Sequence, residues 1–361
     1  MWMIIFLILP FMGIAYVAWH VWELVPLSPL WRVAIIATGI VSFLMIFLNL
    51  GRVIDRLPMT WARLVYDVGN SSIFVLLYLV IVFLLLDVAR LVHLIPPSWL
   101  HHNFVTTAAL AIGLFALFLY GNIHYYNKAR QELTLTTEKP LLREQKVIML
   151  SDLHLGYHNP RKELARWVDI INAEQPDLVL IAGDIIDMSI RPLIDEDMAA
   201  EIRRIHAPIY ACLGNHEYYT SEPLAERFFS DACINLLRDT VANVGNLCII
   251  GRDDRTNTRR KSMEQLAQMA DHSRYTIVLD HQPYDLGQAE QAGIDLQFSG
   301  HTHYGQVWPV SWITHAIYEC PFGSHTRGKT RYYVSSGLGI WGGKYRIGTR
   351  SEYVVAYIRN Y

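Results

Sequence analysis

The sequence predicts an α/β domain preceded by four membrane-spanning helices. Residues 1 to about 125 are strongly apolar, whereas the remainder carries the charge typical of a globular domain. In that remainder, short apolar runs alternate with helical patterns, which is the arrangement of a layered α/β fold. We therefore expect a transmembrane domain at residues 1–126, a linker at 127–145 and a soluble domain at 146–361.

Four hydrophobic stretches account for the transmembrane prediction. Each is close to the roughly 20 residues that a helix needs to cross a hydrocarbon core of about 30 Å. A secretory signal peptide is the alternative for the first stretch, but Met1-Trp2-Met3 provides no basic residue and no small-x-small cleavage site follows. The stretches run from Met3 to Trp22, from Val33 to Leu50, from Ile73 to about Ile95, and from Phe104 to about Tyr120.

Positive charges flank the four stretches unevenly. Because basic residues gather in the cytoplasmic loops of membrane proteins, we expect both termini and the soluble domain to lie in the cytoplasm. The protein would then be a multi-pass protein of a bacterial inner membrane. The two basic segments contain Arg52, Arg56, Arg63, Lys128, Arg130, Lys139 and Arg143, against Arg32 and Arg90 in the other two loops.

The overall charge and the cysteines exclude some classes of function. A net charge of -2 and a pI near 6.7 provide no basic stripe for nucleic acid, so nucleic acid is not the favoured partner. The cysteine spacing matches no metal knuckle or redox pair, and we expect free thiols in the cytoplasm. The cysteines are Cys212, Cys233, Cys248 and Cys320.

Apolar runs in the soluble part predict strands that end in polar loops. In open α/β sheets, active sites lie at the carboxyl ends of the strands, and five chemically distinctive blocks follow such runs directly. We expect helices near 161–173 and 195–205. The expected strands are Val147–Leu150, Leu178–Ala182, Ile209–Leu213, Leu247–Ile250, Tyr275–Leu279, Leu296–Phe298, Arg331–Val334 and Tyr353–Ile358.

The first two blocks supply carboxylates and a histidine. Asp152 and His154 are two residues apart, so on an extended backbone they would point to the same face and could hold one ion. Gly183 permits a tight turn that places Asp184 at a strand end, and its two oxygens make it a candidate bridge between two cations. Asp187 is better suited to orienting a histidine. Taken alone, these residues could equally cap helices.

The other three blocks supply an amide and histidines. The Asn215 oxygen is a neutral hard ligand, with a helix N-cap as its alternative. His216 would face the substrate and support the leaving oxygen as a general acid. A single histidine such as His281 is more often structural. His301 and His303, about 6.5 to 7 Å apart on an extended strand, could straddle two ions about 3.5 to 4 Å apart.

In this order the blocks resemble the calcineurin-like metallophosphoesterase family, whose pattern is D-x-H, G-D-x-x-D, G-N-H, a later H, and G-H-x-H. The resemblance covers roughly 146–361 and implies a metallophosphoesterase β-sandwich flanked by helices. Narrower motifs, including Asp152-Leu-His-Leu-Gly156, are similar to a bacterial membrane-associated branch with YkuE-type phosphoesterases and lipid A precursor hydrolases. Tyr304 stands where that branch usually has a second glycine.

The resemblance implies a dinuclear metal-dependent phosphoric ester hydrolase. We expect it to hydrolyse a phosphomonoester, phosphodiester or pyrophosphate, on a lipid or lipid precursor at the bilayer. A non-catalytic metal-binding scaffold or membrane partner is the alternative. Oxygen and imidazole ligands suit manganese, iron or zinc. The family roles assign one ion to Asp152, His154, Asp184 and His303, and the other to Asp184, Asn215, His281 and His301.

A glycine-rich segment near the C-terminus is predicted to be a solvated surface loop. It runs from Gly337 to Gly343 and is followed by Lys344, Arg346 and Arg350. The alternative is a mobile rim whose basic residues contact phosphate or lipid head groups.

Overall fold

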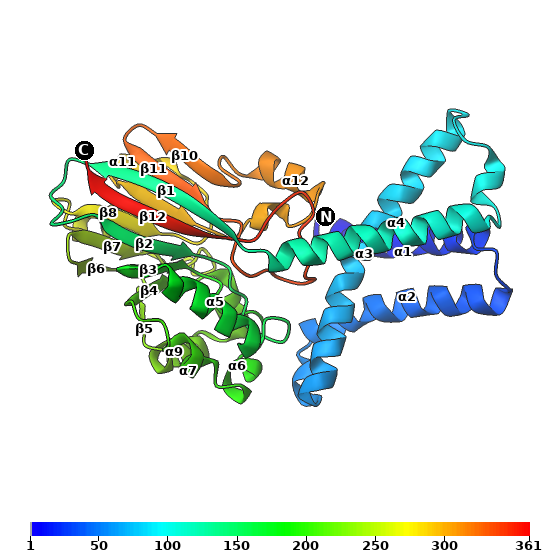
Figure 1. The fold of residues 1–361 in the computed structure, drawn as a ribbon, viewed down its shortest axis with the longest axis horizontal. Helices are drawn as coiled ribbons and strands as arrows, with labels where there is room; N and C mark the ends of the chain where they lie inside the picture. Colours follow the sequence, from blue (N-terminus) through cyan, green and yellow to red (C-terminus); the bar gives the residue numbers. More distant parts are fainter. Residues whose placement is uncertain (1) are drawn as a thin grey trace. The chain divides into compact units, whose positions relative to one another are not determined.

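The computed structural model describes residues 2–361, and for residues 2–7 it describes the helical backbone alone. The chain forms two compact units. A helical unit comprises Met1–Gly121 with Gly342–Lys344, and an α/β unit comprises Asn122–Trp341 with Tyr345–Tyr361. Figure 1 shows the helices of the first unit and the sheets of the second.

The helical unit contains long apolar helices. Among the described residues, three helices are long and apolar enough to cross a membrane: α2, α3 and α4. The apolar part of α1 that is described, Ile8–Leu24, is shorter, and the start of the first expected span lies outside the described side chains. A fourth span therefore stays a prediction. The helices are α1 Trp2–Leu24, α2 Pro29–Leu50, α3 Met59–Leu91 and α4 Phe104–Tyr126.

An ionisable residue of α3 connects this helix to α1. The Tyr16 hydroxyl donates to Oδ2 of Asp87 at 2.6 Å, and Nε2 of His20 lies 3.0 Å from the same oxygen. Arg90, one turn further along α3, is 3.5 Å from the other carboxylate oxygen. Because an ionised group at membrane depth is costly without partners, these contacts favour a fixed packing of α1 on α3.

Two six-stranded mixed sheets form the α/β unit, which confirms the predicted fold class. Their strand orders are β1-β12-β2-β3-β4-β5 and β10-β11-β9-β8-β7-β6. The strands of the first sheet are β1 Ala129–Thr137, β12 Glu352–Asn360, β2 Gln145–Leu150, β3 Leu178–Ala182, β4 Ile209–Cys212 and β5 Ile234–Leu236. Those of the second are β10 Gly323–Arg327, β11 Thr330–Val334, β9 Leu296–Ser299, β8 Tyr275–Leu279, β7 Leu247–Gly251 and β6 Thr240–Val244.

Three apolar cores hold the layers together. One joins side chains of both sheets, among them Met149, Leu180, Ile277 and Phe298, so the sheets pack face to face. The outer face of the first sheet packs on α5, α7 and α9. The outer face of the second packs on α10 and α11. The helices are α5 Arg161–Ala173, α6 Arg191–Asp195, α7 Met198–Ile202, α8 Asn215–Thr220, α9 Glu222–Asp231, α10 Met263–Met269, α11 Gly287–Gln291 and α12 Val310–Ile317.

Two segments differ from the sequence expectation. The expected polar linker contains β1, which pairs in parallel with β12 along its whole length. Its exposure alternates along the strand and few of its side chains are buried, so a polar composition is compatible with this edge position. The helix expected near 195–205 is two short helices, α6 and α7, separated at Asp197, whose side chain accepts from the amide of Ala200.

Glu174 connects α5 to the edge of the first sheet. Nε of Arg130 in β1 donates to its carboxylate at 2.7 Å, and Nζ of Lys146 in β2 lies 2.8 Å away. Burial alone would raise the pKa of Glu174, but the hydrogen bonds from Arg130 and Lys146 outweigh it and lower this pKa to about 2.

We expect Glu174→Gln to lower the stability of the full-length protein in detergent at pH 7 by about 1 kcal/mol, since solvent partly screens these pairs. Because the pKa of Glu174 is lower in the folded state, its ionised carboxylate stabilises the fold at pH values above the unfolded-state pKa of 4.5. This stabilisation is lost as the pH falls toward about 2. The Tm difference between wild type and variant should therefore shrink across that window. Glu132→Gln, which removes only an exposed partner of Arg130, is the control. A difference that does not change with pH would contradict this explanation.

Candidate metal centre

The predicted site residues lie where the parallel strands of both sheets end. Asp152, Asp184 and Asn215 follow β2, β3 and β4 of the first sheet, and His281 and His301 follow β8 and β9 of the second. Because these strands are paired in parallel, the loops that follow them lie at the same edge of each sheet. The sandwich therefore brings both sets of loops to one place.

The backbone of these loops differs from the sequence expectation. Asp152 and His154 have φ of 53° and 45°, and His301 and His303 have φ of 69° and 46°. The interpretation that each pair lies on an extended strand is therefore wrong, because all four residues are in the left-handed region. Asp184 shares this conformation, with φ of 51°. Left-handed backbone in non-glycine residues is costly and clusters at functional sites.

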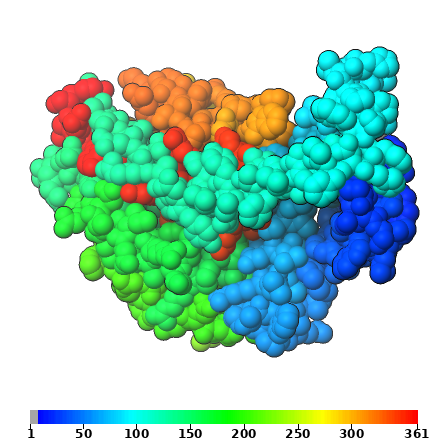
Figure 2. Space-filling model, turned by 45° about the vertical axis from the view of Figure 1, so that its right-hand side comes forward, coloured from blue at the N-terminus to red at the C-terminus, as the bar shows by residue number. Residues whose placement is uncertain are grey.

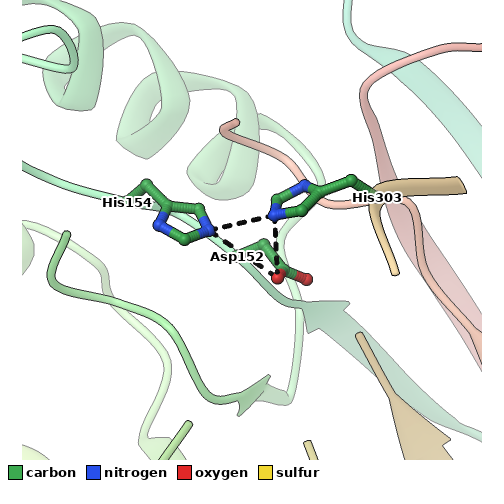
Figure 3. A group of neighbouring side chains, drawn as sticks. All are labelled: Asp152, His154 and His303. Carbon is green, nitrogen blue, oxygen red and sulfur yellow. Dashed lines mark hydrogen bonds and ion pairs between the residues drawn. The ribbon is translucent and has the colours of Figure 1, made fainter. Parts of the chain in front are cut away.

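One group of donor atoms comes from Asp152, His154 and His303. Nε2 of His154 lies 3.1 Å from Nε2 of His303, and Oδ1 of Asp152 lies 3.4 Å from the latter nitrogen and 3.8 Å from the former. Figure 3 shows both rings and the carboxylate directing these atoms toward one another. Imidazole nitrogens that meet a carboxylate oxygen in this way are a ligand set for a divalent metal ion.

A second group comes from Asp184, His281 and His301, whose ligand atoms lie within 4.8 Å of one another. Nε2 of His281 is 3.1 Å from Oδ2 of Asp184. The same carboxylate oxygen is 3.7 Å from Nε2 of His154, a member of the first group. Asp184 therefore lies between the two groups, in the position that a carboxylate shared by two ions requires.

The buried polar atoms of the site fit divalent ions. Among the described residues, the buried Asn215 side-chain oxygen has no hydrogen-bond partner. Asp152, His154, Asp184 and His281 are almost completely buried. Because a buried acceptor without a partner is costly, the Asn215 oxygen and the converging nitrogens favour a bound cation over an empty polar cavity.

The pKa values of three histidines in the two donor groups are shifted in different directions. Burial lowers the pKa of His303 to about 3 and that of His301 to about 4, so both rings are neutral and able to ligate near neutral pH. Burial opposes the charge on His154 as well, but hydrogen bonds with Asp152 and Asp187 outweigh it and raise its pKa to about 10. Cation binding would therefore displace a proton from His154.

His216 and Asp187 lie beside the donor groups. Nδ1 of His216 is 3.1 Å from the backbone oxygen of Asp187 and 3.4 Å from its Oδ1. Nδ1 of His154 is 3.3 Å from that same Oδ1. The Asp187 carboxylate thus fixes the orientation of two imidazoles. The His216 ring stands edge-on to His154, with centroids 4.5 Å apart, and keeps a small exposed area.

Two glycines leave room for the carboxylates. A Cβ atom on Gly214 would lie 2.2 Å from Oδ1 of Asp184, and one on Gly300 would lie 2.2 Å from Oδ2 of Asp152. A side chain at either position would displace a carboxylate from the site. The glycines that precede Asn215 and His301 in the sequence therefore allow the neighbouring loops to pack closely.

Glu217 is a functional residue for which the sequence analysis defined no role. It is completely buried, and its carboxylate accepts hydrogen bonds from the amides of Gly214 at 2.7 Å, Ile186 at 2.9 Å and Asp184 at 3.1 Å. It therefore joins the loop after β3 to the loop after β4. A glutamate three residues into a helix, as in a capping box, was the signal that could have identified it.

Arg346 is not part of a solvated surface loop. Its side chain is completely buried, and Nη1 donates to the backbone oxygen of His303 at 2.7 Å. Nη2 donates to the backbone oxygen of Ser336, and Nε donates to the Ser351 hydroxyl at 3.1 Å. The guanidinium thus braces the turn that carries His303. The guanidinium group has five hydrogen-bond donors in one plane, so it can bind several backbone acceptors at once. The glycine-rich sequence around Arg346 did not indicate this buried position.

Comparisons with known proteins agree with this geometry. Residues 145–305 match the model of the calcineurin-like phosphoesterase family. An uncharacterized metallophosphoesterase of Helicobacter pylori is 31% identical, covering 60% of this chain and 60% of its own length. One from Campylobacter jejuni is 29% identical, covering 68% of this chain and 67% of its own length. A transmembrane protein with a metallophosphoesterase domain from Bos taurus is 29% identical over 59% of this chain and 52% of its own length.

The matched part spans about 60% of the length of the first curated relatives. Among solved structures, a dimetal phosphatase from Danio rerio is 12% identical, with a TM-score of 0.35 and coverage of 54% of this chain and 87% of that chain. The ordered motifs and the converging side chains agree with this family match. Residues 145–305 are therefore the part of the chain that resembles the calcineurin-like phosphoesterases.

Proposed function

We propose that this protein is a membrane-anchored phosphoric ester hydrolase with a dinuclear centre of manganese, iron or zinc. The position of Asp184 between two groups of donor atoms carries the proposal. Two neighbouring divalent ions neutralise the charge of a phosphate ester and activate water for attack on phosphorus. One ion would be held by Asp152, His154, Asp184 and His303, and the other by Asp184, Asn215, His281 and His301.

His216 is the residue that we assign to the leaving group. Its Nδ1 is turned toward Asp187, so Nε2 is the ring atom left to meet a substrate oxygen. The contacts of Nδ1 with Asp187 orient the ring, and a proton on Nε2 would stabilise the oxygen that departs from phosphorus. A non-catalytic scaffold would have no need of this histidine and carboxylate pair beside the ligands.

The substrate that we propose is a phosphomonoester, phosphodiester or pyrophosphate of a lipid or lipid precursor. The long apolar helices support a membrane location, and the relatives include proteins named as transmembrane. Anchoring raises the local concentration of substrates that reside in the bilayer. The basic segments around Arg52 and Lys128 favour the cytoplasmic face of a bacterial inner membrane.

Asp184→Asn should remove both metal occupancy and activity, because the amide keeps the shape of the side chain but loses the charge shared by two ions. We expect the metal content of the full-length protein, measured by elemental analysis, to fall by at least one ion per chain. Hydrolysis of a chromogenic phosphodiester should fall about 100-fold or more. Asp195→Asn, on exposed α6, should change neither measurement. Full activity in the Asp184 variant would refute the dinuclear proposal.

His216→Gln tests general acid catalysis. The loss in kcat should be about 100-fold or more for an alkyl phosphodiester, whose leaving oxygen needs a proton, and much smaller for a nitrophenyl ester, whose leaving group does not. Comparing the two substrates with one enzyme preparation cancels any difference in folding or metal loading. Equal losses for both substrates would assign His216 to metal binding or positioning instead.

Arg346→Met should weaken the ion held by His303, because the turn loses the donor to the His303 carbonyl group. In calorimetric titration of manganese into metal-stripped protein, we expect one of two sites to lose about 10-fold in affinity. Arg346→Lys should recover part of this loss. Arg350→Met, which removes a half-exposed arginine nearby in sequence, should not alter the titration. An unchanged titration for Arg346→Met would show that the guanidinium does not position the ligand.

A further inference from the structure

Helix α12 buries two polar residues and exposes most of its apolar residues. Ser311 and Thr314 are buried, with exposed fractions of 6% and 8%. The apolar side chains of the helix and of the residue before Pro309 are exposed to solvent. These residues form the α12 patch: Trp308 at 42% exposure, Trp312 at 65%, Ile313 at 58% and Ile317 at 56%. A surface helix of a globular domain normally shows the opposite distribution.

The helix is fixed in this orientation by contacts with the metal-site turn. The Tyr304 hydroxyl lies 2.9 Å from Nε2 of His315 in α12, and the Tyr304 ring stacks on Phe322 with centroids 4.9 Å apart. The Trp308 amide donates to the backbone oxygen of Ile347 at 2.7 Å. The Trp308 and Trp312 rings meet edge to face at 5.3 Å. Contacts within the fold therefore hold the apolar face of α12 outward.

The patch differs from the rest of the surface of the α/β unit. Within the described residues, other strongly exposed apolar side chains such as Leu142, Ile194 and Met269 come from separate segments. Figure 2 shows the orange segment that contains α12 at the molecular surface. Contiguous apolar surface of this kind marks an interaction site, whereas scattered apolar residues are normal.

We propose that the α12 patch inserts into the head-group region of the bilayer that the helices of the same chain enter. Tryptophan and isoleucine on one face are the composition of an interfacial helix, and tryptophan prefers the membrane–water boundary. The eight residues Val310–Ile317 contain no acidic side chain that an anionic lipid surface would repel. Because the chain has helices of membrane length, a bilayer is held near the patch by covalent connection.

This contact places the metal-site turn at the lipid surface. Only Gln306 to Pro309 separate the turn His303–Gly305 from α12, and Tyr304 of this turn contacts His315 of the helix. A patch embedded about 5 to 10 Å into the head-group boundary would hold this turn at the depth of lipid phosphates. Membrane contact through the α12 patch does not depend on whether the centre hydrolyses a lipid.

The test places a fluorescent reporter on the patch in the full-length protein. Cys233, the exposed cysteine, is changed to serine, and Ile313→Cys is labelled with an environment-sensitive dye in liposomes of phosphatidylglycerol and phosphatidylethanolamine at a low protein-to-lipid ratio. The matched control is Ile194→Cys on α6, whose native side chain is exposed to a similar extent, at 64%. Protein with Cys233→Ser alone reports background labelling of the buried cysteines.

We expect the dye at position 313 to emit at shorter wavelength than the dye at 194, to be quenched by spin-labelled lipid chains, and to be protected from aqueous iodide. Equal iodide quenching at both positions would overturn the proposal, because the patch would then face water. A blue-shifted dye at 313 that lipid spin labels do not quench would also overturn it, since the patch would then be covered by protein, such as a second copy of this chain. Neither outcome depends on phosphoesterase activity.

Discussion

The packing of Asp184 among buried imidazoles is the constraint on which the site depends. Its carboxylate accepts a hydrogen bond from the backbone amide of His216 at 2.9 Å and lies close to the rings of His281 and His154. A second buried carboxylate, Glu217, accepts from the amide of Asp184 itself. Burial, and then the nearby charge of Asp184, raise the pKa of Glu217. Removing one partner of such a group is strongly destabilising, so the histidines and the cations they would share with Asp184 are part of the packing.

This constraint explains the arrangement of the sheets. The carboxylates and the amide oxygen come from one sheet, while His281, His301 and His303 come from the other. The apolar core between the sheets sets the distance between the two sets of loops, and strand register sets their height. Gly214 and Gly300 allow the final approach, because any Cβ there would overlap a carboxylate oxygen. The convergence of these donor atoms therefore depends on packing well away from them.

Much of the site could be predicted from the sequence because each block follows an apolar strand. The pattern does not record backbone conformation, which is why Asp152 and His303 were expected on extended strands. Residues that act through backbone groups were missed for a similar reason. Glu217 and Arg346 contact amides and carbonyl groups, which every sequence provides, so their partners cannot be recognised from the side-chain types around them. The edge strand β1 was missed because one polar face removes its hydrophobic signal.

Tyr304 connects the chemistry of the centre to the surface around it. Glycine adopts a left-handed backbone at little steric cost, whereas other residues seldom do. Here Tyr304 has φ of 50°, a conformation that costs a tyrosine more than a glycine. Its ring stacks on Phe322 and its hydroxyl reaches His315 of α12, and these contacts offset the cost. The tyrosine thereby couples the turn that bears His303 to a helix that presents tryptophan and isoleucine outward. The candidate metal-binding residues follow the strand ends of the fold, and Tyr304 extends their packing to the surface through α12.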